Sequence, residues 1–183
     1  RIRSITDKRI NPLMINYTMN GGYIPYDSWV QKEEGGGRII GEACHIFDLF
    51  RSMTGSEAVS VSCNGINPNT GSVHSSDNVV VTIQYADGSV CSLIYTGLGS
   101  KEAFKERMEV FCDEQLLILE DYQYLKSYGV KCNWSSKRPE KGHLEELKFF
   151  HSEILKGNRF PIPLEELEET WLISRQVADQ LSV

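Results

Sequence analysis

The stretch Gly35–Gly55, GGGRIIGEACHIFDLFRSMTG, passes from a run of glycines into a helical hydrophobic period. This period predicts a helix from Arg38 to about Met53, and Gly55 stands where a left-handed C-terminal cap is expected. At about 100° per residue, the apolar side chains fall within one arc of about 140°, which we expect to face the core. These side chains are Ile39, Ile40, Ala43, Ile46, Phe47, Phe50 and Met53.

Three glycines before a helix raise the question of a phosphate loop. The spacing G-x-x-x-x-G is present over Gly36–Gly41, but Glu42 and Ala43 replace the Lys and Ser/Thr that contact phosphates and magnesium. A carboxylate at that position would repel a phosphate. The dinucleotide pattern G-x-G-x-x-G also fails, because Ile40 stands at its third glycine and no strand directly precedes the run. Neither pattern is indicated.

A metal site is also poorly supported. Glu42 and His45 have the i, i+3 spacing of Glu-x-x-His pairs in carboxylate-bridged metal sites, but the chain has only one such pair. The other three histidines lie far along the chain, so we expect no metal ion. Cys44 lies about 100° of helix rotation away from this pair, which also disfavours a Cys–His nucleophile.

A general acid/base role suits the polar stripe of this helix better. Arg38, Glu42 and His45 follow one another at spacings of four and three, so they share one side of the helix. Histidine exchanges protons near neutral pH, a neighbouring acid can orient it, and an arginine can hold a substrate oxygen. The plain structural alternative is a solvated Arg–Glu pair beside a half-buried histidine. Three residues without Cβ favour the functional interpretation, because they allow another body to approach closely.

Length and composition describe an ordinary globular chain. Its 183 residues suit one domain over 1–183, and 40% hydrophobic residues without a long apolar run exclude a membrane protein. A net charge of −6 argues against a nucleic-acid partner. Five cysteines without a CxxC pattern suggest a reducing cytoplasm. The chain starts at Arg1 without a leader, so we expect a fragment.

Strand signals dominate the rest of the chain. Asp87-Gly88 and Asp113-Glu114 predict two tight hairpins. The expected strands are Pro12–Met19, Ala58–Ile66, Asn78–Tyr85, Ser89–Tyr95, Glu106–Cys112, Gln115–Asp121 and Tyr124–Trp134. Helices are expected over His143–Leu155 and from Pro163 to about Leu181. We therefore predict an α+β domain with an open, predominantly antiparallel sheet, a central meander, and helices packed on one face.

Two surfaces of this domain are expected to bind partners or ligands. The strands carry apolar side chains on both faces, so we expect a homo-oligomer formed through the sheet. The aperiodic stretch from residue 23 to residue 37 includes Tyr26 and Trp29, which we expect to line a pocket.

The segment GGGRIIGEACHIFDLF resembles the C-terminal domain of the glucose-fructose oxidoreductase/inositol dehydrogenase family, the Gfo/Idh/MocA family. Members show a Gly-rich loop, then an Asp, a His four residues later, and an Asp three residues beyond. Gly35–Gly37, His45 and Asp48 match in register, but the first Asp falls on Gly41. We expect the neighbouring Glu42 to replace it.

The resemblance extends over nearly the whole chain. It includes a strand that ends in Asn20-Gly21, a tryptophan before the glycines, an Asp-Gly hairpin and two closing helices. The implied fold is the open sheet of a C-terminal domain like that of glyceraldehyde-3-phosphate dehydrogenase. The N-terminal dinucleotide-binding domain of the family is absent from this chain.

The resemblance implies reversible hydride transfer between NAD or NADP and a hydroxyl of a sugar, sugar derivative or cyclitol. His45 would be the catalytic base, and Glu42 and Arg38 would fix the polyol. The remaining implied site residues fall into two groups. Asn20, Tyr26, Trp29 and Asp48 would bind substrate, and Gly35, Gly36 and Gly37 would make room for the cofactor.

One further expectation concerns cofactor binding, and a second interpretation of the chain stays open. We expect no tight NAD binding by this chain alone, because the cofactor site belongs to the absent half. The rival interpretation is a non-catalytic module, either for oligomerisation or for carbohydrate binding, and Gly41 is its best support.

Overall fold

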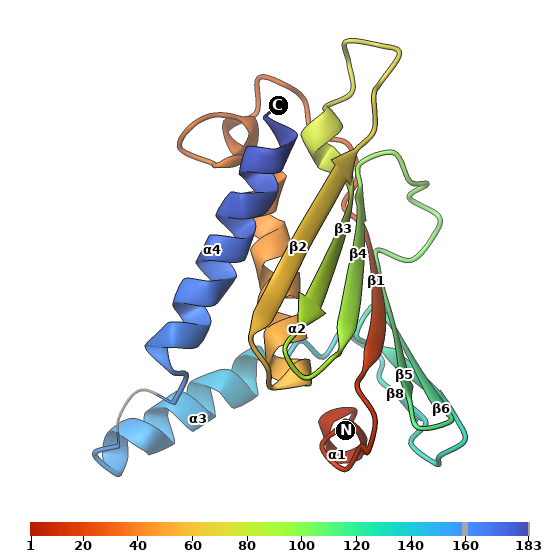
Figure 1. Cartoon of the computed structure of the whole chain (residues 1–183), viewed down its shortest axis with the longest axis vertical. Helices are drawn as coiled ribbons and strands as arrows, with labels where there is room; N and C mark the ends of the chain where they lie inside the picture. Colours follow the sequence, from red (N-terminus) through yellow and green to blue (C-terminus); the bar gives the residue numbers. More distant parts are fainter. Residues whose placement is uncertain (159–160, 183) are drawn as a thin grey trace.

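The computed structural model describes residues 1–158 and 161–182 as an open mixed sheet with helices on one of its faces (Figure 1). The strands are β1 (Met14–Asn20), β2 (Ala58–Gly65), β3 (Asn78–Tyr85), β4 (Val90–Thr96), β5 (Glu106–Cys112), β6 (Gln115–Glu120), β7 (Tyr124–Tyr128) and β8 (Trp134–Ser135). The helices are α1 (Arg3–Thr6), α2 (Cys44–Thr54), α3 (His143–Leu155) and α4 (Leu164–Leu181), with short segments η1 (Trp29–Gln31), η2 (Ile39–Ala43) and η3 (Ser75–Asp77). The predicted α+β class is confirmed.

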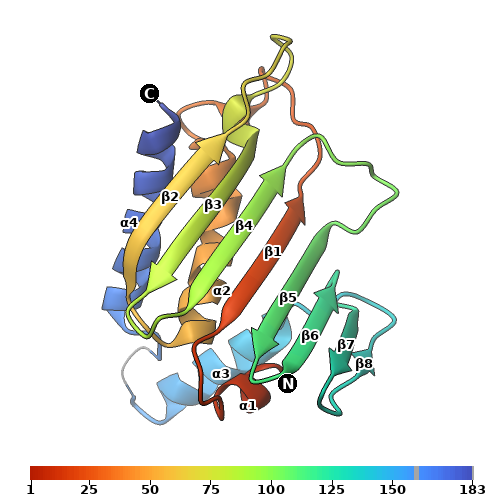
Figure 2. The ribbon, with the colours of Figure 1, turned by 45° about the vertical axis from the view of Figure 1, so that its right-hand side comes forward.

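The strands follow the order β2-β3-β4-β1-β5-β6-β7-β8 across the sheet (Figure 2). Met14 of β1 lies opposite Val90 in a parallel pairing with β4 and opposite Phe111 in an antiparallel pairing with β5. The prediction of one continuous meander is therefore wrong at its centre, where the first strand separates β4 from β5. Alternation of apolar residues shows which face a strand buries, but it does not show which strands lie beside it.

Both predicted hairpins are confirmed. The turn between β3 and β4 has Gly88 at φ 89°, and the turn between β5 and β6 has Asp113 at φ 42° and Glu114 at φ 62°. In the β5–β6 turn, positive φ at both central residues matches the right-handed twist of the flanking strands. The strand expected over Tyr124–Trp134 is instead divided into β7 and β8, with Gly129 at φ 75° in the reversal between them.

The core lies between the sheet and the two helices α2 and α4, which pack against each other behind β2, β3 and β4 (Figure 2). The predicted apolar arc faces this core, although Ile40 is only half-buried. The helix differs at its start, because η2 is a π-helical turn and the α-helix begins at Cys44. Such wider turns are often found at functional sites. Gly55 ends α2 in the left-handed region, as predicted.

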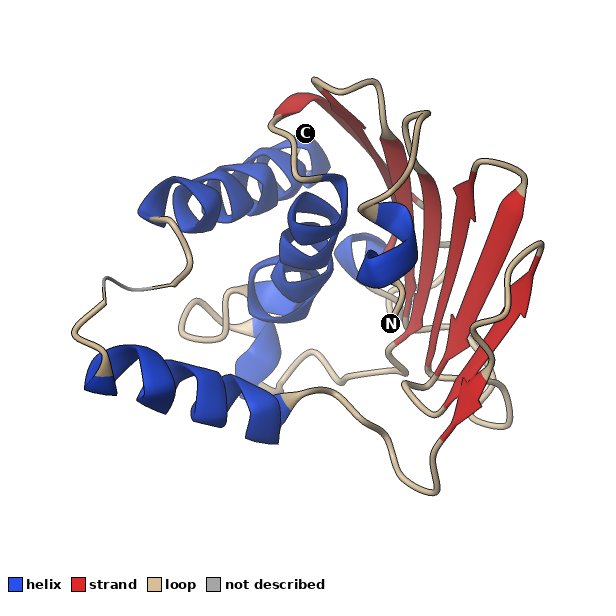
Figure 3. Cartoon of the chain, turned by 90° about the horizontal axis from the view of Figure 1, so that it is seen from below, coloured by secondary structure: helices blue, strands red, loops and turns tan. Residues whose placement is uncertain are grey.

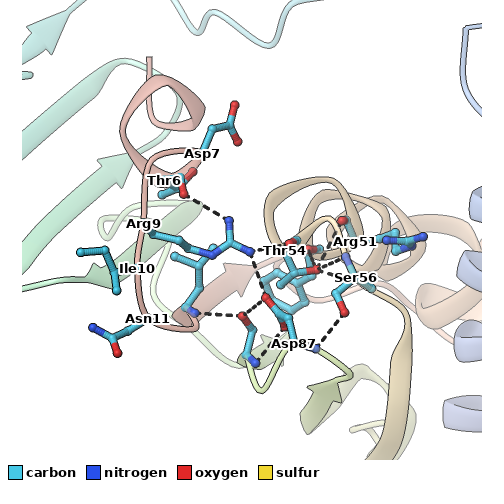
Figure 4. A network of polar contacts seen from close by, with 12 residues as sticks. Thr6, Asp7, Arg9, Ile10, Asn11, Arg51, Thr54, Ser56 and Asp87 are labelled. Carbon is cyan, nitrogen blue, oxygen red and sulfur yellow. Dashed lines mark hydrogen bonds and ion pairs between the residues drawn. The ribbon is translucent and has the colours of Figure 1, made fainter.

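Arg9, which follows α1, forms hydrogen bonds to two segments that lie far from it in the sequence (Figure 4). Its Nη2 donates to the Thr54 carbonyl at 2.6 Å and to the Asp87 carboxylate at 2.9 Å, and its Nη1 donates to the Thr6 carbonyl at 3.1 Å. Ser89 also donates to Asp87 through its hydroxyl at 2.8 Å. The C-terminal end of α2 and the β3–β4 turn are thus fixed by one guanidinium group.

α3 projects away from the sheet and the other long helices (Figure 3). None of its residues is buried, in contrast to α2 and α4. Across residues 1–158 and 161–182, no helix combines the length and apolarity needed to cross a lipid bilayer.

Candidate active site

A cavity of about 400 Å³ opens on the helical side of the sheet, where η2, α2 and the N-terminal end of α3 meet. Its lining also includes the C-terminal half of β1, the start of β5 and the turn between β6 and β7. The lining residues are Tyr17, Met19, Glu42, His45, Ile46, Lys105, Glu106, Tyr122, Lys141, His143 and Glu146. The mixture of acids, bases and hydroxyls suits a small polar ligand, and the volume lies at the low end of ligand pockets.

His45 is the second residue of α2, and its side chain is exposed at this cavity. It lies neither inside the hydrocarbon core nor on the outer face of the sheet. The preceding π-helical turn brings Glu42 to the same cavity. The structure therefore brings together the two residues that were predicted as catalytic.

The Glu42 carboxylate is held by three neighbours. Its Oε2 accepts a hydrogen bond from the Tyr95 hydroxyl and lies 3.1 Å from Nε of Arg38, and its Oε1 lies 3.7 Å from Nζ of Lys105. Burial and the hydrogen bond to Glu42 raise the pKa of Tyr95, so its hydroxyl stays protonated as a donor. Within the described residues, no hydrogen bond joins Glu42 to His45.

Arg38 lies behind Glu42 and does not line the cavity. Only 3% of its surface is exposed, and its Nε donates to the Tyr95 hydroxyl. The guanidinium also lies over the Tyr95 ring, 5.1 Å from the ring centre. A Cβ on Gly21 would come within 2.0 Å of Arg38, so the glycine after β1 is needed for this packing. Arg38 thus supports the site from beneath.

A second polar cluster forms the opposite wall, and no motif in the sequence indicated it. Glu106 is 8% exposed; its Oε1 accepts from the Tyr17 hydroxyl at 3.1 Å and its Oε2 lies 2.6 Å from Nζ of Lys141. The hydroxyls of Tyr17 and Tyr122 lie 3.3 Å apart. Burial raises the pKa of both tyrosines, which therefore remain neutral hydroxyl groups.

Tyr122 holds an unusual backbone conformation at this wall. Its φ is 54° and that of Asp121 is 50°, values that non-glycine residues rarely adopt. Both residues lie in the turn between β6 and β7, where a pair of positive φ values is the same hairpin geometry as at Asp113 and Glu114. The Tyr122 carbonyl also accepts a hydrogen bond from the Glu140 amide at 2.9 Å, which fixes the segment leading to Lys141.

The remaining predicted substrate residues lie outside the cavity. Asn20 donates from Nδ2 to the carbonyls of Ser100 and Phe104, at 2.8 and 3.3 Å, and so holds the loop between β4 and β5. Trp29 is 67% exposed. Tyr26 is also exposed, and its hydroxyl donates to the Val73 carbonyl at 3.2 Å.

Asp48 is half-buried one turn after His45 on α2 and likewise does not line the cavity. Burial raises the pKa of its carboxyl group, Glu166 of α4 adds to this effect, and His45 opposes it. Asp48 therefore lies close enough to Glu166 and His45 for both charges to act on its carboxyl group.

Each of the three glycines in the run Gly35–Gly37 is explained by the local backbone, through either a close contact or a positive φ. A Cβ on Gly35 would meet the Trp29 carbonyl oxygen at 2.4 Å, and Gly36 and Gly37 have φ values of 66° and 72°. A Cβ at Gly37 would meet nothing within 4 Å, so that side of the loop is open. Gly41 is also exposed, and a Cβ there would contact only the Gly35 carbonyl, at 3.3 Å.

The described part of the chain holds no cluster of three or more His, Cys, Asp or Glu residues that could bind a metal ion. A second and more apolar cavity, of about 700 Å³, lies beside the first and shares Tyr122 with it. Its wall includes Leu49, Met108, Leu125 and Trp134, and it contains none of the predicted site residues. The polar cavity at His45 is therefore the better place for acid/base chemistry.

Solved structures with this fold include several sugar oxidoreductases. UDP-N-acetylglucosamine 3-dehydrogenase GnnA from Acidithiobacillus ferrooxidans matches with a TM-score of 0.69 and 16% identity, over 98% of this chain and 56% of that one. Levoglucosan dehydrogenase in complex with NADH and L-sorbose matches with a TM-score of 0.73 and 17% identity, over 99% and 58%. Aldose-aldose oxidoreductase from Caulobacter crescentus, complexed with glycerol, matches with a TM-score of 0.72 and 13% identity, over 99% and 56%.

At these identities the likeness establishes the fold alone, and the chain spans less than two thirds of the length of these relatives. No curated protein sequence matches the chain significantly. The family model of the GFO/IDH/MocA C-terminal domain matches residues 9–118, which include β1, the glycine run, His45 and the strands through β5. The chain therefore belongs to the GFO/IDH/MocA family, in which it corresponds to the C-terminal domain.

Proposed function

We propose that the chain is the substrate-binding half of a nicotinamide-dependent oxidoreductase that acts on a hydroxyl of a sugar, sugar derivative or cyclitol. The observation that carries this proposal is the meeting of His45 and Glu42 at one polar cavity within a GFO/IDH/MocA C-terminal domain. Solved relatives hold NADH, levoglucosan, L-sorbose or glycerol, which supports a polyol as the ligand class.

In this proposal His45 removes the proton from the substrate hydroxyl, because its imidazole is exposed at the cavity and can act there as a general base. A bound nicotinamide would supply the hydride acceptor, and it would be held by a dinucleotide-binding domain outside these 183 residues. Glu42 fixes substrate hydroxyls in place of the family Asp at Gly41, and its bonds to Tyr95 and Arg38 hold its carboxylate in one position. The cavity suits the polyol but is too small for a whole dinucleotide as well.

The other predicted site residues have proposed roles that follow from where they lie in the structure. Arg38 and Asn20 position Glu42 and the β4–β5 loop. Tyr26, Trp29 and Asp48 remain predicted substrate contacts that lie outside the present cavity. The glycine run Gly35–Gly37 remains the predicted approach for NAD or NADP, and the open space at Gly37 supports this role.

The test uses the full-length protein expressed from the complete reading frame. His45→Ala should lower kcat by about 100-fold or more, because general acid/base catalysis contributes about that much. His74→Ala, which changes a histidine outside the cavity, should leave kcat within about twofold of wild type. The isolated chain should show no tight NAD binding in calorimetry. Unchanged turnover of His45→Ala, or micromolar NAD affinity of the isolated chain, would contradict the proposal.

The rival function is a non-catalytic module for oligomerisation or carbohydrate binding. Gly41 favours it, because the family acid is missing there. The reading frame upstream of Arg1 distinguishes the two. A strand–GxGxxG–helix unit in that reading frame supports the enzyme, whereas a different domain supports the module.

We also propose that the domain forms homo-oligomers through the outer face of the sheet, in the cytoplasm. All five cysteines are free, as a reducing compartment requires. The apolar side chains exposed on this face include Met14, Val80, Ile94 and Phe111. Sedimentation of the protein at high concentration tests this proposal, and a clean monomer would remove it.

A further inference from the structure

Tyr122 stands between the polar candidate site and the larger apolar cavity beside it, and it lines both. Its ring lies beside Lys141, whose Nζ is 5.2 Å from the ring centre. Its backbone belongs to the turn between β6 and β7, directly after Asp121. The Asp121 carboxylate accepts hydrogen bonds from the amides of Lys105 and Glu106, both at 2.8 Å. The turn that carries Tyr122 is therefore fixed to the start of β5.

The hydroxyl of Tyr122 begins a chain of hydrogen bonds that has only one direction. A phenol carries one proton and can donate one hydrogen bond, whereas a carboxylate can only accept. The Glu106 carboxylate accepts from the Tyr17 hydroxyl at 3.1 Å, which uses the single proton of Tyr17. The Tyr17 oxygen lies 3.3 Å from the Tyr122 oxygen and can then only accept, so Tyr122 is the donor in that pair.

This direction leaves the Tyr122 oxygen as an acceptor. Its proton is used toward Tyr17, so any further partner of this hydroxyl must be a donor. Within residues 1–158 and 161–182, no second group forms a hydrogen bond with it. Tyr17, Glu106 and Lys141 line the polar cavity and not the apolar one, so the hydroxyl end of Tyr122 belongs to the polar cavity. A ligand in that cavity is placed to supply the donor.

We propose that the Tyr122 hydroxyl determines substrate specificity by accepting a hydrogen bond from a second, non-reacting hydroxyl of the polyol. The inference rests on the proposed function and adds a specificity residue to the same site. Tyr122 belongs to the wall opposite His45, so the hydroxyl that it binds differs from the one that His45 deprotonates. The oxidised carbon becomes a carbonyl, which cannot donate, so only a non-reacting hydroxyl keeps this bond in both substrate and product. A polyol without a donor at this position leaves the Tyr122 oxygen unpaired and binds more weakly.

The test measures polyol binding by the 183-residue chain without nucleotide, in NMR titrations. The probes are D-glucose, D-galactose, D-mannose and myo-inositol, and the tightest binder is then compared with its monodeoxy and monodeoxyfluoro analogues. Loss of one particular hydroxyl should weaken binding to the wild-type chain about 5-fold and should not weaken binding to Tyr122→Phe, which has no oxygen to pair. The fluoro analogue at the same carbon should bind as weakly as the deoxy analogue, because fluorine cannot donate a hydrogen bond.

Tyr124→Phe is the matched control. Tyr124 is 55% exposed and lies outside the cavity, so this variant should discriminate among the analogues as the wild type does. A Tyr122→Phe chain that binds all analogues equally less well would overturn the inference, because it would show a purely structural role. Full binding of the fluoro analogue would also overturn it, since Tyr122 would then be the donor. Absence of binding of all four polyols would overturn it as well.

The full-length protein separates this inference from the proposed function. Tyr122→Phe should raise KM about 5-fold and leave kcat within about twofold, because it removes binding that substrate and transition state share. Selective binding that depends on Tyr122, in a protein without NAD(H)-dependent turnover, would support the specificity residue and reject the proposed function. Turnover of a polyol with an unchanged KM in Tyr122→Phe would support the proposed function and reject the specificity residue.

Discussion

The helices α2 and α3 have similar lengths, eleven and thirteen residues, and both have an apolar face, but their surroundings are opposite. In α2, Phe47 and Phe50 are fully buried against the sheet and α4, whereas Leu147 of α3 is 65% exposed. The comparison teaches that a hydrophobic period identifies a helix and its inner face without identifying the surface that covers it. In α2 that surface is in the same domain. In α3 the apolar side chains stay exposed within the described residues.

The largest expected difference between the two helices is in stability. Phe50→Ala should lower the free energy of unfolding by about 3–5 kcal/mol, because it leaves a cavity beside Tyr17, whose ring centre lies 6.4 Å away. Leu147→Ala should change it by less than about 0.5 kcal/mol in the isolated chain. Urea unfolding followed by circular dichroism gives both values, and similar losses would mean that α3 is packed in solution.

A smaller effect should follow from releasing the N-terminal end of α3. Lys141→Met removes the cation beside Glu106 and should cost about 1–3 kcal/mol, because a mostly buried carboxylate is left without its partner. Lys148→Met, at an exposed ion pair with Glu145, should cost less than about 0.5 kcal/mol. Equal costs in urea unfolding would show that the Glu106 pair does not fix α3.

The C-terminal end of α2 offers a pH-dependent test. Burial tends to raise the pKa of Asp87, but hydrogen bonds from Ser89 and Arg9 outweigh it and lower the pKa below its usual value. A lowered pKa stabilises the folded state above about pH 4 and ceases to do so as the pH falls through the folded-state value. Asp87→Asn should therefore cost about 1 kcal/mol at pH 7 and nothing near pH 2. A cost independent of pH would show that the charge of Asp87 contributes nothing.

The smallest expected effect has the opposite sign. Burial raises the pKa of Asp48, with a further contribution from Glu166 that His45 opposes. The folded state then binds a proton more tightly than the unfolded state, so stability falls as the pH rises from about 4 through the folded-state pKa. Asp48→Asn should therefore raise the melting temperature slightly at pH 7 and leave it unchanged near pH 3. A lower melting temperature at pH 7 would show that the ionised carboxylate stabilises the contact between α2 and α4.

Only part of the candidate site could be predicted from the sequence. His45 and Glu42 belong to one helical segment, so a local spacing of three residues was enough to place them together. Glu106, Tyr17 and Lys141 come from β5, β1 and the connection before α3. Only the pairing of β1 with β5 brings the first two side by side, and no local pattern encodes that pairing. The burial of Arg38 beneath Tyr95 was missed for the same reason, because β4 supplies the tyrosine.

The sequence by itself determined the helices, most strands, the hairpin turns and the family, because backbone preferences and hydrophobic periods act over a few neighbouring residues. Only the tertiary structure decided that β1 lies between β4 and β5, that two polar clusters enclose one cavity, and that Leu147 and other apolar side chains of α3 stay exposed. These features depend on contacts between residues far apart in the chain. Such contacts are selected by the packing of the whole domain rather than by any single segment.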